Sequence, residues 1–182
     1  MTDEPLLEMR NVTQRFGGLC ALSDASFAVR AGHAHGIIGP NGAGKTTAFN
    51  VITGIYAPTQ GDIVFCGQSI AGQRPSHIAR NGIGRTFQNI RLFRNLSVLD
   101  NVRIARDARS AYLWPSALLQ LPSARRAEKE NIRVCAELLK QFGLGDVMHE
   151  QAGGLPYGSQ RRLEIVRAMA LQPKLLLLDE PA

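Results

Sequence analysis

The run Gly39-Pro40-Asn41-Gly42-Ala43-Gly44-Lys45-Thr46-Thr47 fits the phosphate-binding pattern G-x-x-x-x-G-K-[ST], and the rest of the chain can be placed around it. Its glycines let the backbone turn tightly and bring N–H groups close to a polyphosphate. The pattern predicts that Lys45 reaches the β- and γ-phosphates and that the Thr46 hydroxyl ligates Mg²⁺. The alternative interpretation is a structural glycine turn.

The segments on either side of this loop favour a phosphate site over a simple turn. Residues 35–38 form a short apolar segment that predicts a strand. Residues 47–52 predict a helix, whose positive N-terminal end would face the anion. Strand, loop and helix therefore follow one another in the order typical of phosphate-binding loops.

Length and composition indicate one ordinary globular domain. The chain has 182 residues, of which 45% are hydrophobic and 20% charged. No apolar run approaches the ~18 residues that span a bilayer, and the N-terminus carries acids where a secretory signal carries bases. Cys20, Cys66 and Cys135 are too far apart for a C-x-x-C site and odd in number. We therefore expect a reducing, cytosolic setting.

The net charge of +6 is concentrated in one region. Residues 85–126 contain eight arginines against only Asp100 and Asp107. Such a patch would suit nucleic acid or an anionic membrane surface. A solvated helical face beside a protein partner is an equally good interpretation.

Hydrophobic patterns predict a β layer followed by a mainly helical region. Strands are expected at 6–12, 22–29 and 61–67, beside the phosphate loop. An irregular, proline-punctuated insert is expected at 112–122. Helices are expected at 75–81, from Ser97 as cap to about residue 110, at 123–142 and at 159–171.

A continuous apolar run near the end of the chain, Leu175 to Leu178, leads directly into Asp179 and Glu180. This pattern predicts a parallel strand covered on both faces. Acids at the C-terminal end of such a strand lie where open α/β sheets bind ligands. The segment thus has the form of a second strand associated with Mg²⁺.

Taken with Gln88 after a short strand and the segment 157–162, these motifs closely resemble the ATP-binding subunits of ABC transporters. The longer strings at 15–19, 85–93 and 160–165 resemble the branched-chain amino-acid importer type. Importers of urea or of another amino acid share these strings and are the nearest alternatives.

The resemblance implies an α/β fold, with a P-loop NTPase (RecA-like) core, an antiparallel β layer and an inserted helical subdomain. The expected single domain covers residues 1–182, with its C-terminal part missing. Within it we expect the β layer and phosphate-loop core at 1–88 and the helical subdomain at 89–153. The signature helix and the second metal-associated strand are expected at 154–182.

The resemblance also implies roles for individual residues. Phe16 would stack on adenine, although a packed turn aromatic is the alternative. Gln88 would contact Mg²⁺ and the attacking water, Asp179 would hold Mg²⁺ through water, and Glu180 would act as general base. Lys45 and Gln88 complete the catalytic set, and Thr46, Gln88 and Asp179 the metal set. The implied nucleotide-contacting residues are Phe16, Asn41, Gly42, Ala43, Gly44, Lys45, Thr46, Thr47, Tyr157, Gly158 and Ser159.

The segment 155–159 resembles the family signature that caps the γ-phosphate bound to an opposite subunit. Tyr157 matches the amino-acid importer variant, but Pro156 stands where serine or alanine is usual. Proline lacks both a hydroxyl and a backbone N–H, so we expect weaker closure of the dimer.

The resemblance implies ATP and Mg²⁺ as cofactors and a peripheral position on the cytoplasmic face of the inner membrane. The implied partners are a second ATP-binding subunit in a head-to-tail dimer, two permease membrane subunits and an external solute-binding protein. No nucleic acid is expected. Two other functions stay open: a non-catalytic nucleotide-binding fragment, and an ABC-type ATPase acting on nucleic acid.

Overall fold

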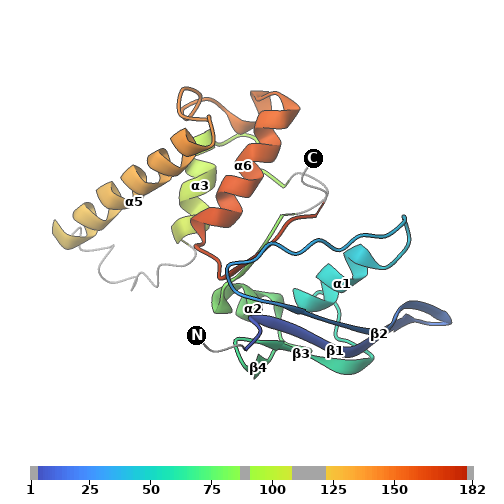
Figure 1. Cartoon of the computed structure of the whole chain (residues 1–182). Helices are drawn as coiled ribbons and strands as arrows, with labels where there is room; N and C mark the ends of the chain where they lie inside the picture. Colours follow the sequence, from blue (N-terminus) through green and yellow to red (C-terminus); the bar gives the residue numbers. More distant parts are fainter. Residues whose placement is uncertain (1–3, 87–90, 108–121, 180–182) are drawn as a thin grey trace. The chain divides into compact units, whose positions relative to one another are not determined.

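A computed structural model describes residues 4–86, 91–107 and 122–179 (Figure 1). Gln88, Glu180 and the expected insert at 112–122, except for its final residue, lie outside the described residues. The chain divides into two compact units, Met1–Ile83 and Gly84–Ala182. The finer division at residues 88 and 153 stays a prediction.

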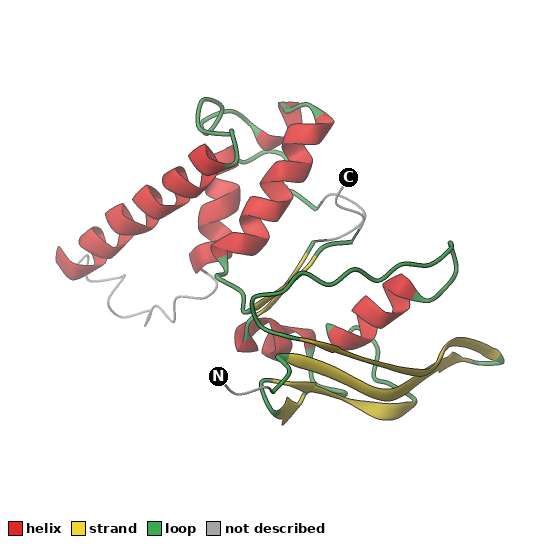
Figure 2. Cartoon of the chain, in the orientation of Figure 1, coloured by secondary structure: helices red, strands yellow, loops and turns green. Residues whose placement is uncertain are grey.

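The first unit is built on an antiparallel sheet, as the sequence predicts. Its strand order is β2-β1-β3-β4, so β1 lies between its two long partners (Figure 2). The β1–β2 hairpin pairs Phe16 with Leu19 across a turn in which Gly17 has a φ of 57°. The strands are β1 (Leu7–Phe16), β2 (Leu19–Val29), β3 (Gln60–Phe65) and β4 (Gln68–Ser69).

Helix α1 (Lys45–Ile52) lies along one face of this sheet (Figure 1). Its buried side chains are Ala48, Val51 and Ile52, and β1 and β3 also withdraw apolar side chains from water. Helix α2 (Pro75–Asn81) begins with proline at its first position and ends at Gly82, whose φ is 109°. The buried core residues of these elements include Leu7, Met9, Val12, Ala48, Val51, Ile52, Ile63, Phe65 and Ile78.

The strand expected at 35–38 is not present, so this prediction is wrong. These residues form an irregular extended segment, and the Ile38 side chain is 97% exposed. A strand needs a neighbour that accepts and donates backbone hydrogen bonds, whatever its side chains. In the part of the chain that the structure describes, no strand pairs with residues 35–38.

In the second unit, the described residues form three α-helices around one apolar core. The helices are α3 (Val98–Asp107), α5 (Pro122–Gln141) and α6 (Tyr157–Ala170), close to the predicted ranges. Ser97 caps α3 as expected, because its hydroxyl accepts the Asp100 N–H at 3.0 Å and donates to the Asp100 carboxylate. The core comprises Val98, Leu99, Val102, Cys135, Leu139, Leu144, Ala152, Leu155, Leu163, Val166 and Ala170.

A fully buried asparagine, which the hydrophobic pattern does not reveal, fixes the chain that enters α3. The Asn101 amide accepts the Phe93 N–H at 2.9 Å and donates to the carbonyls of Phe93 and Ser97. Every polar atom of the side chain is thereby used inside the core. Residues 93–97 are consequently held against α3.

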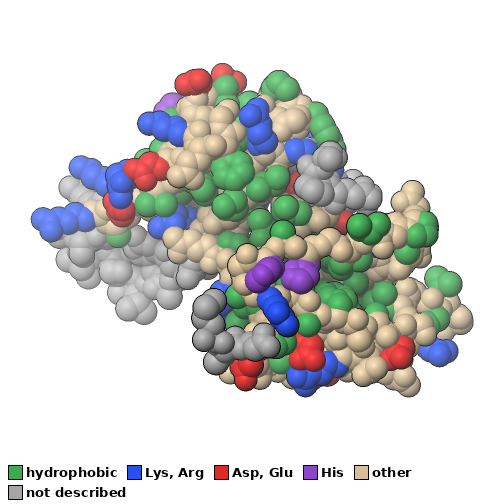
Figure 3. All heavy atoms as spheres, viewed as in Figure 1, with side chains coloured by type: hydrophobic (Ala, Val, Ile, Leu, Met, Phe, Trp, Pro, Cys, Tyr) green, Lys and Arg blue, Asp and Glu red, His purple; other side chains and the backbone are tan. Residues whose placement is uncertain are grey.

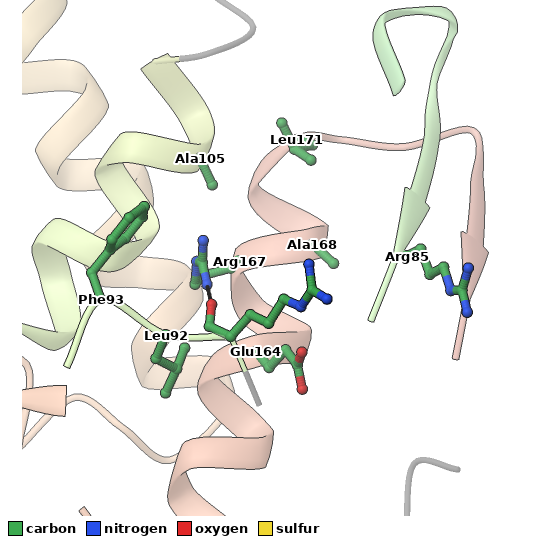
Figure 4. A pocket seen from close by; sticks show the side chains of 9 residues that line it. Arg85, Leu92, Phe93, Ala105, Glu164, Arg167, Ala168 and Leu171 are labelled. Carbon is green, nitrogen blue, oxygen red and sulfur yellow. Dashed lines mark hydrogen bonds between the residues drawn. The ribbon is translucent and has the colours of Figure 1, made fainter. Parts of the chain in front are cut away.

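A two-stranded sheet is formed by β5 (Ile83–Arg85) and β6 (Leu175–Leu177). The Thr86 N–H donates to the Leu177 carbonyl at 3.0 Å, and the ribbons run in the same direction (Figure 4). Within β6, Leu177 is buried, whereas Leu175 and Leu176 are only partly buried. The expected strand therefore exists, while the expectation that both faces are covered holds only in part.

No helix among the described residues combines the length and apolarity needed to cross a membrane.

The burial of Cys135 gives a direct test of the helical core. Desolvation raises the pKa of its thiol, so less thiolate forms at a given pH, and packing blocks reagents. Cys20 and Cys66 are exposed. In thiol labelling at pH 8, we expect two thiols to react quickly and Cys135 to react only in denaturant. A variant with Cys20→Ser and Cys66→Ser isolates it, and fast native labelling there would contradict this core.

Candidate functional site

The phosphate loop has a backbone shape that only glycine accommodates at one point. Gly44, the residue before α1, has a φ of 86°, and Gly42 has a φ of 84°. A Cβ on Gly44 would lie 2.5 Å from the backbone oxygen of Ala21 and 2.8 Å from a side-chain carbon of Leu22. Because the nearer atom belongs to the backbone of β2, it has little freedom to move away. The start of α1 therefore sits directly against the sheet.

Lys45 and the first turn of α1 make this loop attractive to anions. The Lys45 ammonium donates to the carbonyls of Gly39 and Pro40 at 2.7 and 2.9 Å, so it is folded over the loop. The first N–H groups of any helix have no acceptor within it, and α1 has no acidic residue in its first turn. The positive end of the helix dipole and one cation thus lie at the same helix start, where anions bind readily.

Phe16 lies at the end of β1 with its ring 40% exposed. The ring packs against Tyr56, with centroids 4.9 Å apart and planes inclined by 75°. A partly exposed aromatic ring is available to a flat π partner such as a nucleobase. Its expected role in stacking on adenine stays a prediction.

Asp179 is buried in the second unit beside Arg85, a residue to which the sequence motifs assign no role. The Arg85 guanidinium donates to the Asp179 carboxylate at 3.1 Å, and the two side chains are only 6% and 9% exposed. The Asp179 N–H also donates to the Thr86 hydroxyl at 3.3 Å. A charged residue at the end of a short strand was the available signal, but its partner lies 94 positions away.

The signature segment leads into α6 without a side-chain cap. Pro156 precedes the helix, and its carbonyl accepts the N–H groups of Ser159 and Gln160 at 2.9 and 3.0 Å. Tyr157 is exposed in the first turn, where its hydroxyl accepts a hydrogen bond from Arg161 at 3.1 Å. Gly158 and Ser159 follow in the same turn. The three predicted contact residues are thus presented at one exposed helix N-terminus.

A pocket of about 440 Å³ lies in the second unit, and residues 91–93 form part of its lining (Figure 4). Arg167 of α6 donates to the Arg91 carbonyl, and its guanidinium carbon lies 5.2 Å from the centroid of the Phe93 ring. Desolvation lowers the pKa of Arg167. The lining residues are Arg85, Arg91, Leu92, Phe93, Ala105, Glu164, Arg167, Ala168 and Leu171.

On α3 and α5, charged side chains of opposite sign are paired with one another. Arg103 contacts both Asp100 and Glu128, and on α5 Arg133 contacts Glu130 and Glu137. Blue and red side chains lie side by side over this helix (Figure 3). This pairing favours a solvated helical face over a nucleic-acid surface.

The donor set suits a magnesium ion that arrives with a nucleotide. Thr46 is exposed in the first turn of α1, and the predicted second oxygen ligand is the Asp179 carboxylate, which is buried beside Arg85. Among the described residues, no cluster of three or more His, Cys, Asp or Glu side chains forms a metal centre by itself. Thr46 and Asp179 belong to different units, so their shared magnesium stays a prediction.

Comparison with known proteins places these features in a family. Residues 22–182 match the model of the family described as "ABC transporter". The chain is 44% identical over 179 residues to the high-affinity branched-chain amino acid transport ATP-binding protein LivG of Escherichia coli, covering 98% of this chain and 70% of LivG. The ADP conformation of MJ1267, an ATP-binding cassette of an ABC transporter, is similar with TM-score 0.81 and 31% identity, covering 98% and 69% of the two chains. The dimeric post-hydrolysis structure of the cassette MJ0796, bound to ADP and Pi, has TM-score 0.79 and 25% identity, covering 97% and 74%.

The Arg85–Asp179 ion pair predicts a large effect on stability. Removing one partner of a buried pair leaves an uncompensated charge, which costs about 3–5 kcal/mol. We expect Arg85→Met to lower the free energy of unfolding in urea by this amount, and Arg85→Met with Asp179→Leu to restore most of it. The matched control is Arg133→Met, at an exposed ion pair, with a much smaller loss. Equal losses for the two single variants would contradict burial of the pair.

Proposed function

The chain belongs to the ABC transporter family, and we propose that it is the ATP-binding and ATP-hydrolysing subunit that powers import of branched-chain amino acids. Its expected P-loop cassette fold is confirmed by the similar solved cassettes. The substrate rests on the likeness to LivG, a branched-chain amino acid transport protein. Selectivity for the solute itself would belong to the partners that touch it.

One observation carries this proposal: the glycine-constrained loop at 39–44 leads into a cation-bearing helix start. Lys45 already donates to two loop carbonyls, and these bonds would be exchanged for bonds to phosphate oxygens when ATP binds. The loop amides then hold the remaining phosphate oxygens. Phe16, in the same unit, would take the adenine against its exposed ring.

The remaining expected roles are to hold magnesium and to activate the hydrolytic water. Magnesium, when bound through Thr46 and Asp179, supplies charge neutralisation at the β- and γ-phosphates. Arg85 keeps the Asp179 carboxylate oriented inside the second unit. Glu180, the next residue, would take a proton from the hydrolytic water, and Gln88 would position that water.

We expect the signature segment to act on a second copy or a similar subunit. MJ0796 is dimeric in its ADP- and phosphate-bound structure, and a head-to-tail dimer would place Tyr157, Gly158 and Ser159 at the partner's nucleotide. Residues 91–93, which line part of the pocket, would meet a membrane permease. Peripheral attachment to the cytoplasmic face of the inner membrane, two permease subunits and an external solute-binding protein complete this proposal.

Two variants should affect different steps, one ATP binding and the other ATP hydrolysis. Lys45→Ala removes the cation that meets the phosphates, so we expect ATP affinity measured by calorimetry to fall at least tenfold. Glu180→Gln removes only the base, so we expect affinity to stay within about twofold while phosphate release falls about 100-fold or more. Lys140→Ala, on the C-terminal turn of α5, is the matched lysine control.

Two outcomes would decide against this function. Unchanged affinity in Lys45→Ala would remove the phosphate site from the proposal. Tight ATP binding by the unmodified chain, without phosphate release even beside its partner subunits, would favour the non-catalytic alternative, for which Pro156 at the signature position is the supporting observation.

A further inference from the structure

We infer that Tyr56 is a positioning residue for the nucleotide base, acting through Phe16. This inference rests on the proposed function, because it requires that Phe16 receives the adenine. Tyr56 itself lies outside the phosphate loop and outside every motif of the sequence. Its role follows from two contacts, one made by its ring and one by its backbone.

The first contact is with the ring of Phe16. The two centroids are 4.9 Å apart and the planes are inclined by 75°, which is the edge-to-face arrangement that aromatic pairs prefer. Both residues are partly exposed, at 40% for Phe16 and 39% for Tyr56. An exposed aromatic side chain turns freely unless a neighbour limits it. Tyr56 therefore restricts the ring of Phe16 to fewer orientations.

The second contact joins Tyr56 to the helix that carries the phosphate site. The N–H groups of Ile55 and Tyr56 both donate to the Asn50 carbonyl, at 2.9 and 3.3 Å. Asn50 belongs to α1, which begins at Lys45. The backbone of Tyr56 is consequently fixed to the last turns of the helix whose first turn faces the phosphates.

The chain just after Tyr56 is tied to the strand that carries Phe16. The Thr59 N–H donates to the Thr13 carbonyl at 2.9 Å, and the Thr59 hydroxyl accepts the Arg15 N–H at 3.0 Å. Residues 56–59 therefore bridge α1 and the end of β1. Through this bridge the base-contacting ring is held at a set position relative to the phosphate loop, which lowers the ordering cost of binding.

A purely structural role and a positioning role make different predictions for two ligands. ATP has a base, whereas inorganic tripolyphosphate has the phosphates alone. If Tyr56 acts through Phe16, its removal weakens binding of ATP and leaves tripolyphosphate unaffected. Damage to the fold would weaken both.

The test is calorimetric titration of the full chain with each ligand in the presence of Mg²⁺. For Tyr56→Leu we expect the Kd for ATP to rise about threefold to tenfold, the range that edge-to-face pairs contribute, with no change for tripolyphosphate. Tyr56→Phe keeps the ring, so we expect its affinity for ATP to equal that of the unmodified chain. Ile55→Ala, which alters the neighbouring side chain but keeps the backbone bond to Asn50, should leave both affinities unchanged.

A double-variant comparison separates this inference from the function on which it rests. Phe16→Leu should weaken ATP binding, and adding Tyr56→Leu to it should cause no further loss, because the two residues act as one unit. Unchanged ATP affinity in Phe16→Leu would overturn the proposed base contact itself. A loss in Phe16→Leu without a loss in Tyr56→Leu, or equal losses for both ligands in Tyr56→Leu, would overturn the role of Tyr56 alone.

Discussion

The close approach of Gly44 to the backbone of β2 is the constraint from which the first unit is organised. With a Cβ only 2.5 Å from the Ala21 oxygen, no other residue could join the loop to α1 at this point. The approach lays α1 on the sheet, where Val51 and Ile52 enter the core. It also leaves the first turn of α1 open to an anion, so packing and binding are consequences of the same contact.

In the second unit, an ion pair is buried beside the short strands β5 and β6. The Asp179 carboxylate is buried beside the Arg85 guanidinium, which compensates its charge in a nearly dry environment. The apolar core of α3, α5 and α6 holds α6 in place, and with it the exposed turn at Tyr157. Hydrophobic burial thus supports a carboxylate and a helix N-terminus without either being apolar itself.

Local patterns predicted most of the elements because the information for them is local. The G-x-x-x-x-G-K-[ST] run, the cap at Ser97 and the helical pattern at 123–142 are each contained in one short segment of sequence. Contacts between distant residues gave no such signal. The Arg85–Asp179 pair and the Phe16–Tyr56 contact depend on chain topology. Residues 35–38 have the apolar composition of a strand, but no described strand pairs with them.

The central claim is that residues 39–47 hold the phosphates of ATP. A crystal structure of the chain with Mg²⁺ and a non-hydrolysable ATP analogue tests it most directly. We expect the triphosphate on the loop amides, the Lys45 ammonium moved from the Gly39 carbonyl to phosphate oxygens, and the base against Phe16. An analogue bound elsewhere, with Lys45 still on the loop carbonyls, would contradict it.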